Sequence, residues 1–149
     1  MEKRILVVDD DDAIRALLFT VLRRRGYKVD VARNGVEAVE RCRQCLYAVV
    51  LLDLMMPRMS GYEVLECLGR EPAESRPVVL VLTAGLEPRN LDTTLVAGTM
   101  HKPFDIDLLL DTVVGCLSSM AERPQNASCP APDSDSRALL TNGTPNDVN

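Results

Sequence analysis

The chain has 149 residues, of which 46% are hydrophobic and 26% are charged. This size and composition are typical of one globular domain with its own core. The formal net charge of −5 argues against a general affinity for nucleic acid. The one dense basic run, residues 23–25, falls where a predicted helix ends, and the helix dipole favours cations there. The longest apolar stretches are too short to span a bilayer.

The five cysteines are irregularly spaced, and a short charged segment, unlike a signal peptide, leads into the first apolar run. We therefore expect reduced thiols and a cytoplasmic location. Cys42 and Cys45 form a C-x-x-C pair, but no second pair or nearby histidine completes a zinc site. Ordinary thiols on a helix are the preferred interpretation of this pair.

The first two predicted strands flank an amphipathic helix. Residues 4–8 form a continuous apolar run, as expected of a strand buried on both faces. Asp12 can cap the following helix, which Gly26 ends. The apolar residues that recur at helical spacing are Ile14, Leu17, Leu18, Val21 and Leu22. Residues 27–32 are the second predicted strand, and a second helix opens at Val36 after an Asn-Gly turn.

The alternation of strands and helices continues through the second half of the domain. Residues 48–52 are the most apolar run in the chain and predict the third strand. A loop that contains Pro57 separates this strand from a helix over residues 61–70. The remaining predicted elements are a strand over residues 78–82, a weak helix near residues 88–97, a short strand over residues 99–101 and a helix over about residues 105–120.

Five successive strand–helix units predict an α/β fold with a parallel sheet covered by helices on both sides. Such sheets bind ligands beyond the carboxyl ends of their strands. We expect residues 1–120 to form this domain. Residues 121–149 are rich in Pro, Ser, Asn and Asp and offer too little apolar surface to offset the entropy of ordering. We therefore expect a disordered C-terminal tail.

Charged and polar residues stand just past four of the predicted strands. Asp9 and Asp10 follow the first strand, Asp53 the third, Thr83 the fourth and Lys102 the fifth. These strand ends converge in a doubly wound sheet, so three carboxylates would crowd together opposite one ammonium. Such a cluster destabilises the fold unless a cation offsets the repulsion. Carboxylate and water oxygens are the ligands that Mg²⁺ prefers.

A carboxylate in such a site can act as a nucleophile and receive a phosphoryl group, which forms an aspartyl phosphate. Catalysis of this transfer consists mostly of positioning and electrostatic stabilisation. Lys102 and Mg²⁺ would supply positive charge, and the Thr83 hydroxyl would supply a hydrogen bond. Each residue alone has an ordinary explanation, such as a solvated loop or an exposed lysine. Together, at the ends of the correct strands, they favour the phosphoryl-transfer site.

Four motifs resemble the receiver domain of bacterial two-component response regulators. They are ILVVDD at residues 5–10, LLDLMMPRMSG at residues 51–61, VLTA at residues 81–84 and HKPF at residues 101–104. The resemblance covers about residues 3–118. It implies a flavodoxin-like (βα)5 fold, with a doubly wound five-stranded parallel sheet in the order 2-1-3-4-5.

The resemblance implies that Asp53 is the phosphoacceptor of an Mg²⁺-dependent site. Asp10 looks like a direct Mg²⁺ ligand, and Asp9 is expected to contribute mainly through water. Asp53 and the backbone carbonyl of Met55 would complete the protein ligands. The expected partners are a sensor histidine kinase, whose phosphohistidine is the donor, or a histidine phosphotransfer protein, and a small phosphodonor can replace the kinase.

The resemblance also implies how phosphorylation would be transmitted. Thr83 looks like the switch hydroxyl and Lys102 like the phosphate-binding lysine. In such domains phosphorylation shifts an equilibrium of the face formed by the fourth helix, the fifth strand and the fifth helix. Two features depart from the family pattern: Thr99 stands where Tyr or Phe is common, and residues 83–102 make a shorter stretch than usual. We therefore expect the fourth helix or the following loop to be trimmed.

We expect the output to pass through an unidentified protein partner, without direct DNA binding or membrane contact. One alternative is a phosphorylation-independent docking module, but such domains typically lose an acid or the lysine, and this chain keeps them all. A second is an aspartyl-phosphate hydrolase, which would need an acid where Met55 stands, so we expect no enzyme activity beyond the domain's own phosphorylation and dephosphorylation. A third is a flavin carrier, which would need a phosphate-binding loop where this chain has four aspartates.

Overall fold

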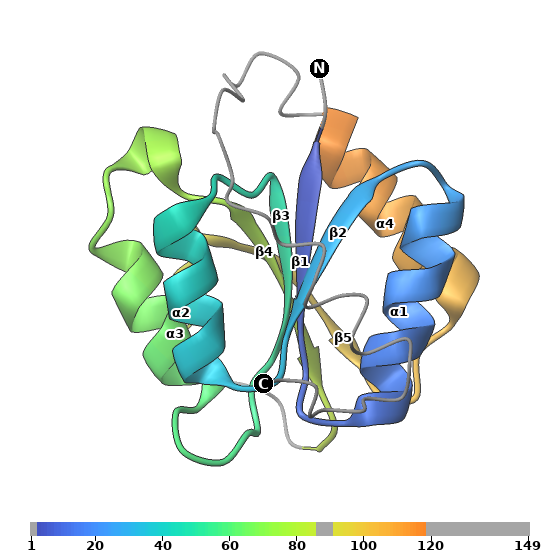
Figure 1. Cartoon of the computed structure of the whole chain (residues 1–149), viewed down its shortest axis with the longest axis horizontal. Helices are drawn as coiled ribbons and strands as arrows, with labels where there is room; N and C mark the ends of the chain where they lie inside the picture. Colours follow the sequence, from blue (N-terminus) through green and yellow to red (C-terminus); the bar gives the residue numbers. More distant parts are fainter. Residues whose placement is uncertain (1–2, 86–90, 119–149) are drawn as a thin grey trace, which may run out of the picture.

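The computed structural model describes residues 3–85 and 91–118. Its strands are β1 (Arg4–Val8), β2 (Lys28–Ala32), β3 (Val49–Asp53), β4 (Val78–Thr83) and β5 (Val96–His101). Its helices are α1 (Asp12–Arg24), α2 (Gly35–Gln44), α3 (Gly61–Gly69), a single 3-10 turn (Ala73–Ser75) and α4 (Ile106–Ser118). The five strands form one parallel sheet in the order β2-β1-β3-β4-β5, which confirms the predicted topology (Figure 1).

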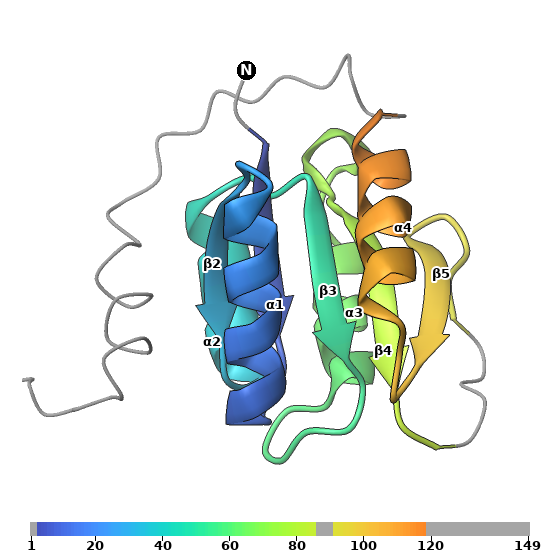
Figure 2. The same ribbon diagram turned by 90° about the vertical axis from the view of Figure 1, so that its right-hand side faces the viewer.

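The sheet lies between two helical layers, with α1 and α4 on one face and α2 and α3 on the other (Figures 1 and 2). Each face has its own apolar core, because successive side chains of a strand point to opposite faces. All five residues of β3 are buried, as expected of the central strand of a sheet covered on both sides. The carboxyl ends of the strands therefore sit on a rigid base.

The start of α1 differs from the prediction by one residue. The N-cap is Asp11, whose carboxylate accepts hydrogen bonds from the backbone N–H groups of Ala13 (2.9 Å) and Ile14 (3.1 Å). Asp12 was predicted as the cap, but it is the first helical residue, and its carboxylate pairs with Arg15. The helix ends at Arg24, and Gly26, which was predicted to stop it, has a positive φ of 94°.

The connection between β4 and β5 also differs from the prediction. The part of the predicted helix that is described, from Leu91 on, is not helical: a turn precedes β5, and β5 begins at Val96. Asp92 organises this turn, because its carboxylate accepts hydrogen bonds from the backbone N–H and the hydroxyl of Thr94. Residues 88–90 lie outside the described part of the chain. The fifth strand is correspondingly longer than predicted.

Cys42, Cys67 and Cys116 are not disulfide-bonded, whereas Cys45 is, so the prediction of reduced cysteines is wrong for Cys45. The predicted tail, residues 121–149, lies outside the described residues, and the division into domain and tail stays a prediction. Within residues 3–85 and 91–118, every helix is too short or too polar to cross a membrane.

Candidate functional site

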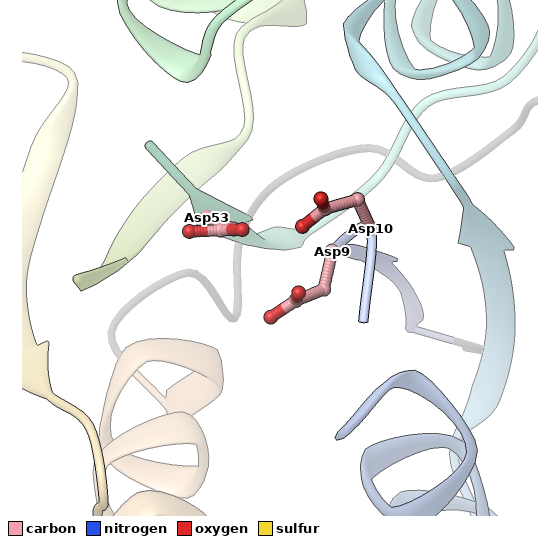
Figure 3. A group of neighbouring side chains, drawn as sticks. All are labelled: Asp9, Asp10 and Asp53. Carbon is pink, nitrogen blue, oxygen red and sulfur yellow. The ribbon is translucent and has the colours of Figure 1, made fainter. Parts of the chain in front are cut away.

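Three carboxylates meet at the carboxyl ends of β1 and β3. Asp9 and Asp10 follow β1, and Asp53 is the last residue of β3. Because these strands are paired with Val8 opposite Leu52, their ends lie side by side. One oxygen of each carboxylate lies within 4.8 Å of an oxygen of the other two, and Figure 3 shows the side chains converging. The predicted meeting of these three residues is confirmed.

Lys102 lies against this cluster, as the sequence predicts. Its Nζ donates a hydrogen bond to Asp9 (2.9 Å) and lies 3.6 Å from Asp53. Its backbone N–H donates to the carbonyl of Thr83 (2.7 Å), which ties the residue after β5 to the end of β4. Burial lowers the pKa of Lys102, but the hydrogen bond and charge of Asp9, together with Asp53, raise it above its ordinary value. Lys102 is therefore held in its charged form.

Asp53 has a raised pKa. Its burial, followed by the negative charge of Asp9, raises its pKa to about 7, against the opposing effect of Lys102. A hydrogen bond from the backbone N–H of Met55 (3.2 Å) also favours the ionised form. One ammonium therefore does not fully offset the carboxylates, and Asp53 ionises with difficulty in the metal-free domain.

The loop after Asp53 depends on a glycine. A Cβ atom at Gly61 would lie 2.6 Å from the carbonyl oxygen of Asp53 and 2.6 Å from the Cα of Leu54. The backbone N–H of Gly61 donates to the Leu54 carbonyl (2.9 Å) at the start of α3. Any side chain at this position would push α3 away from Asp53. Gly61 therefore allows the helix to begin directly against the candidate phosphoacceptor.

Thr83 and Met55 are the two remaining predicted site residues. Thr83 ends β4, and Met55 lies in the loop after Asp53. Thr83 is buried at the end of β4, next to Leu82, which pairs with Asp53. Met55 holds the Asp53 carboxylate through its backbone, while its side chain is 69% exposed. The side chain of Met55 is thus available to a partner and contributes little to the core. A metal-binding role for the Met55 carbonyl stays a prediction.

The donor set fits Mg²⁺. Asp9, Asp10 and Asp53 offer hard oxygen ligands, which Mg²⁺ prefers over nitrogen or sulfur. When all three are ionised, their charge of −3 together with the +1 of Lys102 leaves −2, which one divalent cation neutralises. Burial and the charge of Asp9 raise the pKa of Asp53, and a bound cation would oppose both effects.

Sequence reasoning missed Arg15. Its side chain is only 1% exposed, and its guanidinium donates a hydrogen bond to the backbone carbonyl of Asp9 (2.7 Å) and pairs with Asp12. The available signal was its spacing: Arg15 stands three and seven residues before Leu18 and Leu22, on the buried face of α1. Leu17, which was predicted for that face, is instead 45% exposed.

The sequence of the chain is similar to those of several known proteins. A model of the response regulator receiver domain matches residues 5–114. The chain is 40% identical over 139 residues to protein Rrf1 of Nitratidesulfovibrio vulgaris, covering 89% of this chain and 99% of Rrf1. It is 42% identical over 106 residues to the transcriptional regulatory protein ResD of Bacillus subtilis. That match covers 69% of this chain and 43% of ResD, so the chain spans less than half of this relative.

Solved structures of response regulators have a similar fold. A CheY-like response regulator receiver domain protein from Methanospirillum hungatei superposes with a TM-score of 0.73 at 25% identity, covering 81% of this chain and 98% of that one. The response regulator TrrA from Thermotoga maritima, solved in complex with Mg(2+)-BeF, has a TM-score of 0.69 at 36% identity. It covers 77% of this chain and 99% of that one. The chain belongs to the response regulator receiver domain family of two-component signalling.

Proposed function

We propose that this receiver domain accepts a phosphoryl group on Asp53 in an Mg²⁺-dependent reaction and thereby changes its contacts with a protein partner. The donor is the phosphohistidine of a sensor kinase or of a histidine phosphotransfer protein, or a small phosphodonor. The observation that carries the proposal is the convergence of Asp9, Asp10 and Asp53 within 4.8 Å, with Lys102 touching two of them.

In the proposed reaction, an oxygen of ionised Asp53 attacks the phosphorus, the bond from phosphorus to the donor breaks, and an acyl phosphate forms on Asp53. Bound Mg²⁺ supplies the positive charge that allows the carboxylates to ionise together and stabilises charge on the transferring group. Asp10, Asp53 and the Met55 carbonyl are the proposed direct protein ligands, and Asp9 is proposed to contribute mainly through water. Lys102 binds a phosphoryl oxygen.

Thr83 is proposed to transmit the phosphorylation. Its hydroxyl would donate a hydrogen bond to the new phosphoryl group, as in the family pattern. Thr83 pairs with His101 of β5, and its carbonyl accepts the backbone N–H of Lys102 (2.7 Å), so a shift of Thr83 would move the end of β5. The helix predicted near residues 88–97 does not occur among the described residues between β4 and β5. The predicted fifth helix is α4 of the structure, so we place the output surface on β5 and α4.

The test is the intact mass of the full chain after incubation with acetyl phosphate, with Mg²⁺ or with EDTA. Asp53→Asn removes the proposed acceptor, and Asp111→Asn, an exposed position on α4, is the matched control. We expect one phosphoryl adduct in the wild type and in Asp111→Asn, only with Mg²⁺, and none in Asp53→Asn. If a folded wild type that binds Mg²⁺ forms no adduct with any phosphodonor or kinase, the domain is a docking module.

A further inference from the structure

Arg15 is an unusual residue for its position in the fold. It lies in the first turn of α1 with 1% of its side chain exposed. The positive end of the helix dipole disfavours a cation there, and burial removes the guanidinium from water. An apolar side chain would suit the neighbouring Leu18 and Leu22 without either cost. The presence of a charge therefore calls for a compensating role.

The contacts of Arg15 join the two ends of the turn that carries the acidic residues. One terminal nitrogen donates to the backbone carbonyl of Asp9 (2.7 Å), and the other pairs with the carboxylate of Asp12. The Asp9 carboxylate is held separately, by the backbone N–H of Asp11 (2.9 Å) and by Lys102 (2.9 Å). Arg15 thus fixes the backbone of a residue whose side chain belongs to the carboxylate cluster.

A purely structural ion pair does not account for this arrangement. The Asp12 side chain is 88% exposed, and an ion pair with such a partner contributes little to stability. The Nε of Arg15 is buried and has no hydrogen-bond partner within the described parts of the chain. The buried guanidinium therefore makes only part of the bonds it could make, and its best contact is the one to Asp9.

We infer that Arg15 is a positioning residue of the metal site: its bond to the Asp9 carbonyl sets the β1–α1 turn so that Asp9 and Asp10 face Asp53. This inference rests on the proposed function, because it concerns binding of Mg²⁺ by that same cluster. Groups that orient metal ligands typically change affinity by about 10- to 100-fold when they are removed.

The test compares Arg15→Met, which keeps much of the volume without the charge, with Arg15→Lys, which keeps a charge and a donor. Arg24→Met changes an exposed arginine at the other end of the same helix and is the matched control. Folding is checked by circular dichroism, and the Kd of Mg²⁺ is measured by isothermal titration calorimetry. We expect Arg15→Met to weaken Mg²⁺ binding about 10-fold, Arg15→Lys to weaken it less, and Arg24→Met to leave it unchanged.

Phosphorylation by acetyl phosphate provides a second readout. The Mg²⁺ concentration for half-maximal rate should rise in Arg15→Met, while the rate at saturating Mg²⁺ stays within about twofold of wild type, because Arg15 does not touch the reacting atoms. Folded Arg15→Met with wild-type Mg²⁺ affinity overturns the inference. If that variant does not fold, an unchanged Mg²⁺ Kd in Arg15→Lys overturns it. Failure of the wild type to bind Mg²⁺ would instead refute the proposed function.

Discussion

Replacement of Asp53 by Asn is expected to stabilise the metal-free domain at alkaline pH, although it removes the proposed phosphoacceptor. Burial and the charge of Asp9 raise the pKa of Asp53 to about 7, whereas an aspartate in the unfolded chain has a pKa of about 3.9. The folded state therefore binds this proton more tightly than the unfolded state. The contribution of Asp53 to stability is thus greatest below about pH 4 and is lost as the pH rises to about 7.

One pKa unit corresponds to about 1.4 kcal/mol, so a shift of about three units gives an upper limit near 4 kcal/mol. We expect roughly half of this, about 2 kcal/mol, because the exposed Asp10 opens the cluster to solvent and the neighbouring charges readjust. The amide side chain of the Asp53→Asn variant cannot ionise and avoids this loss at every pH. Its carbonyl oxygen can also still accept the hydrogen bond from the Met55 N–H.

The assay is urea unfolding of wild type and Asp53→Asn at pH 5 and pH 8 with EDTA present. Titration of all other groups is largely common to both proteins, so the difference between them isolates Asp53. The variant should gain about 1 kcal/mol of unfolding free energy over wild type between pH 5 and pH 8, because part of the loss has already occurred below pH 5. Millimolar Mg²⁺ at pH 8 should narrow the difference in stability between the two proteins. Equal pH dependence in the two proteins would refute the high pKa and the crowding that causes it.

Three further outcomes are expected. Mg²⁺ should raise the melting temperature, and Asp10→Asn should stabilise the metal-free domain while weakening Mg²⁺ binding; a melting temperature indifferent to Mg²⁺ would count against the site. Gly61→Ala should lower the free energy of unfolding by about 1–3 kcal/mol in urea melts, because its Cβ would meet the Asp53 carbonyl, and an unchanged value would show that α3 shifts freely. Arg58 has a φ of 69°, so Arg58→Gly should raise the melting temperature through a gain of up to about 1 kcal/mol; a lower value would show that the Arg58 side chain makes compensating contacts.

The strands and the carboxylate cluster could be predicted because their signals are local. Apolar runs mark the buried strands, and the topology of a parallel sheet then brings the residues after β1 and β3 together. The N-cap residue of α1 was not predictable in the same way. Asp11 and Asp12 have the same side chain, so residue type alone does not choose between them, and it is Asp11 that has the extended backbone of an N-cap.

The connection after β4 and the burial of Arg15 depend on tertiary contacts that no short window contains. Leu95 and Val96 pack into the core on the α2–α3 face, which favours a turn and an early strand over the weak helix predicted from spacing. A buried arginine is rare, so the hydrophobic pattern of α1 predicts Leu17, and not Arg15, on the buried face of the helix. The helical stripe through Arg15, Leu18 and Leu22 becomes clear only when the face that packs on the sheet is known.

The central claim is that Asp53 carries the phosphoryl group, and the most direct test locates the adduct. After phosphorylation with acetyl phosphate and Mg²⁺, borohydride reduces an acyl phosphate to the alcohol, which converts the acceptor aspartate into homoserine. Peptide mapping by mass spectrometry then identifies the converted position. The account predicts homoserine at position 53 in samples that contained Mg²⁺ and unmodified Asp53 in samples that contained EDTA. Conversion at Asp9 or Asp10, with Asp53 intact, would contradict it.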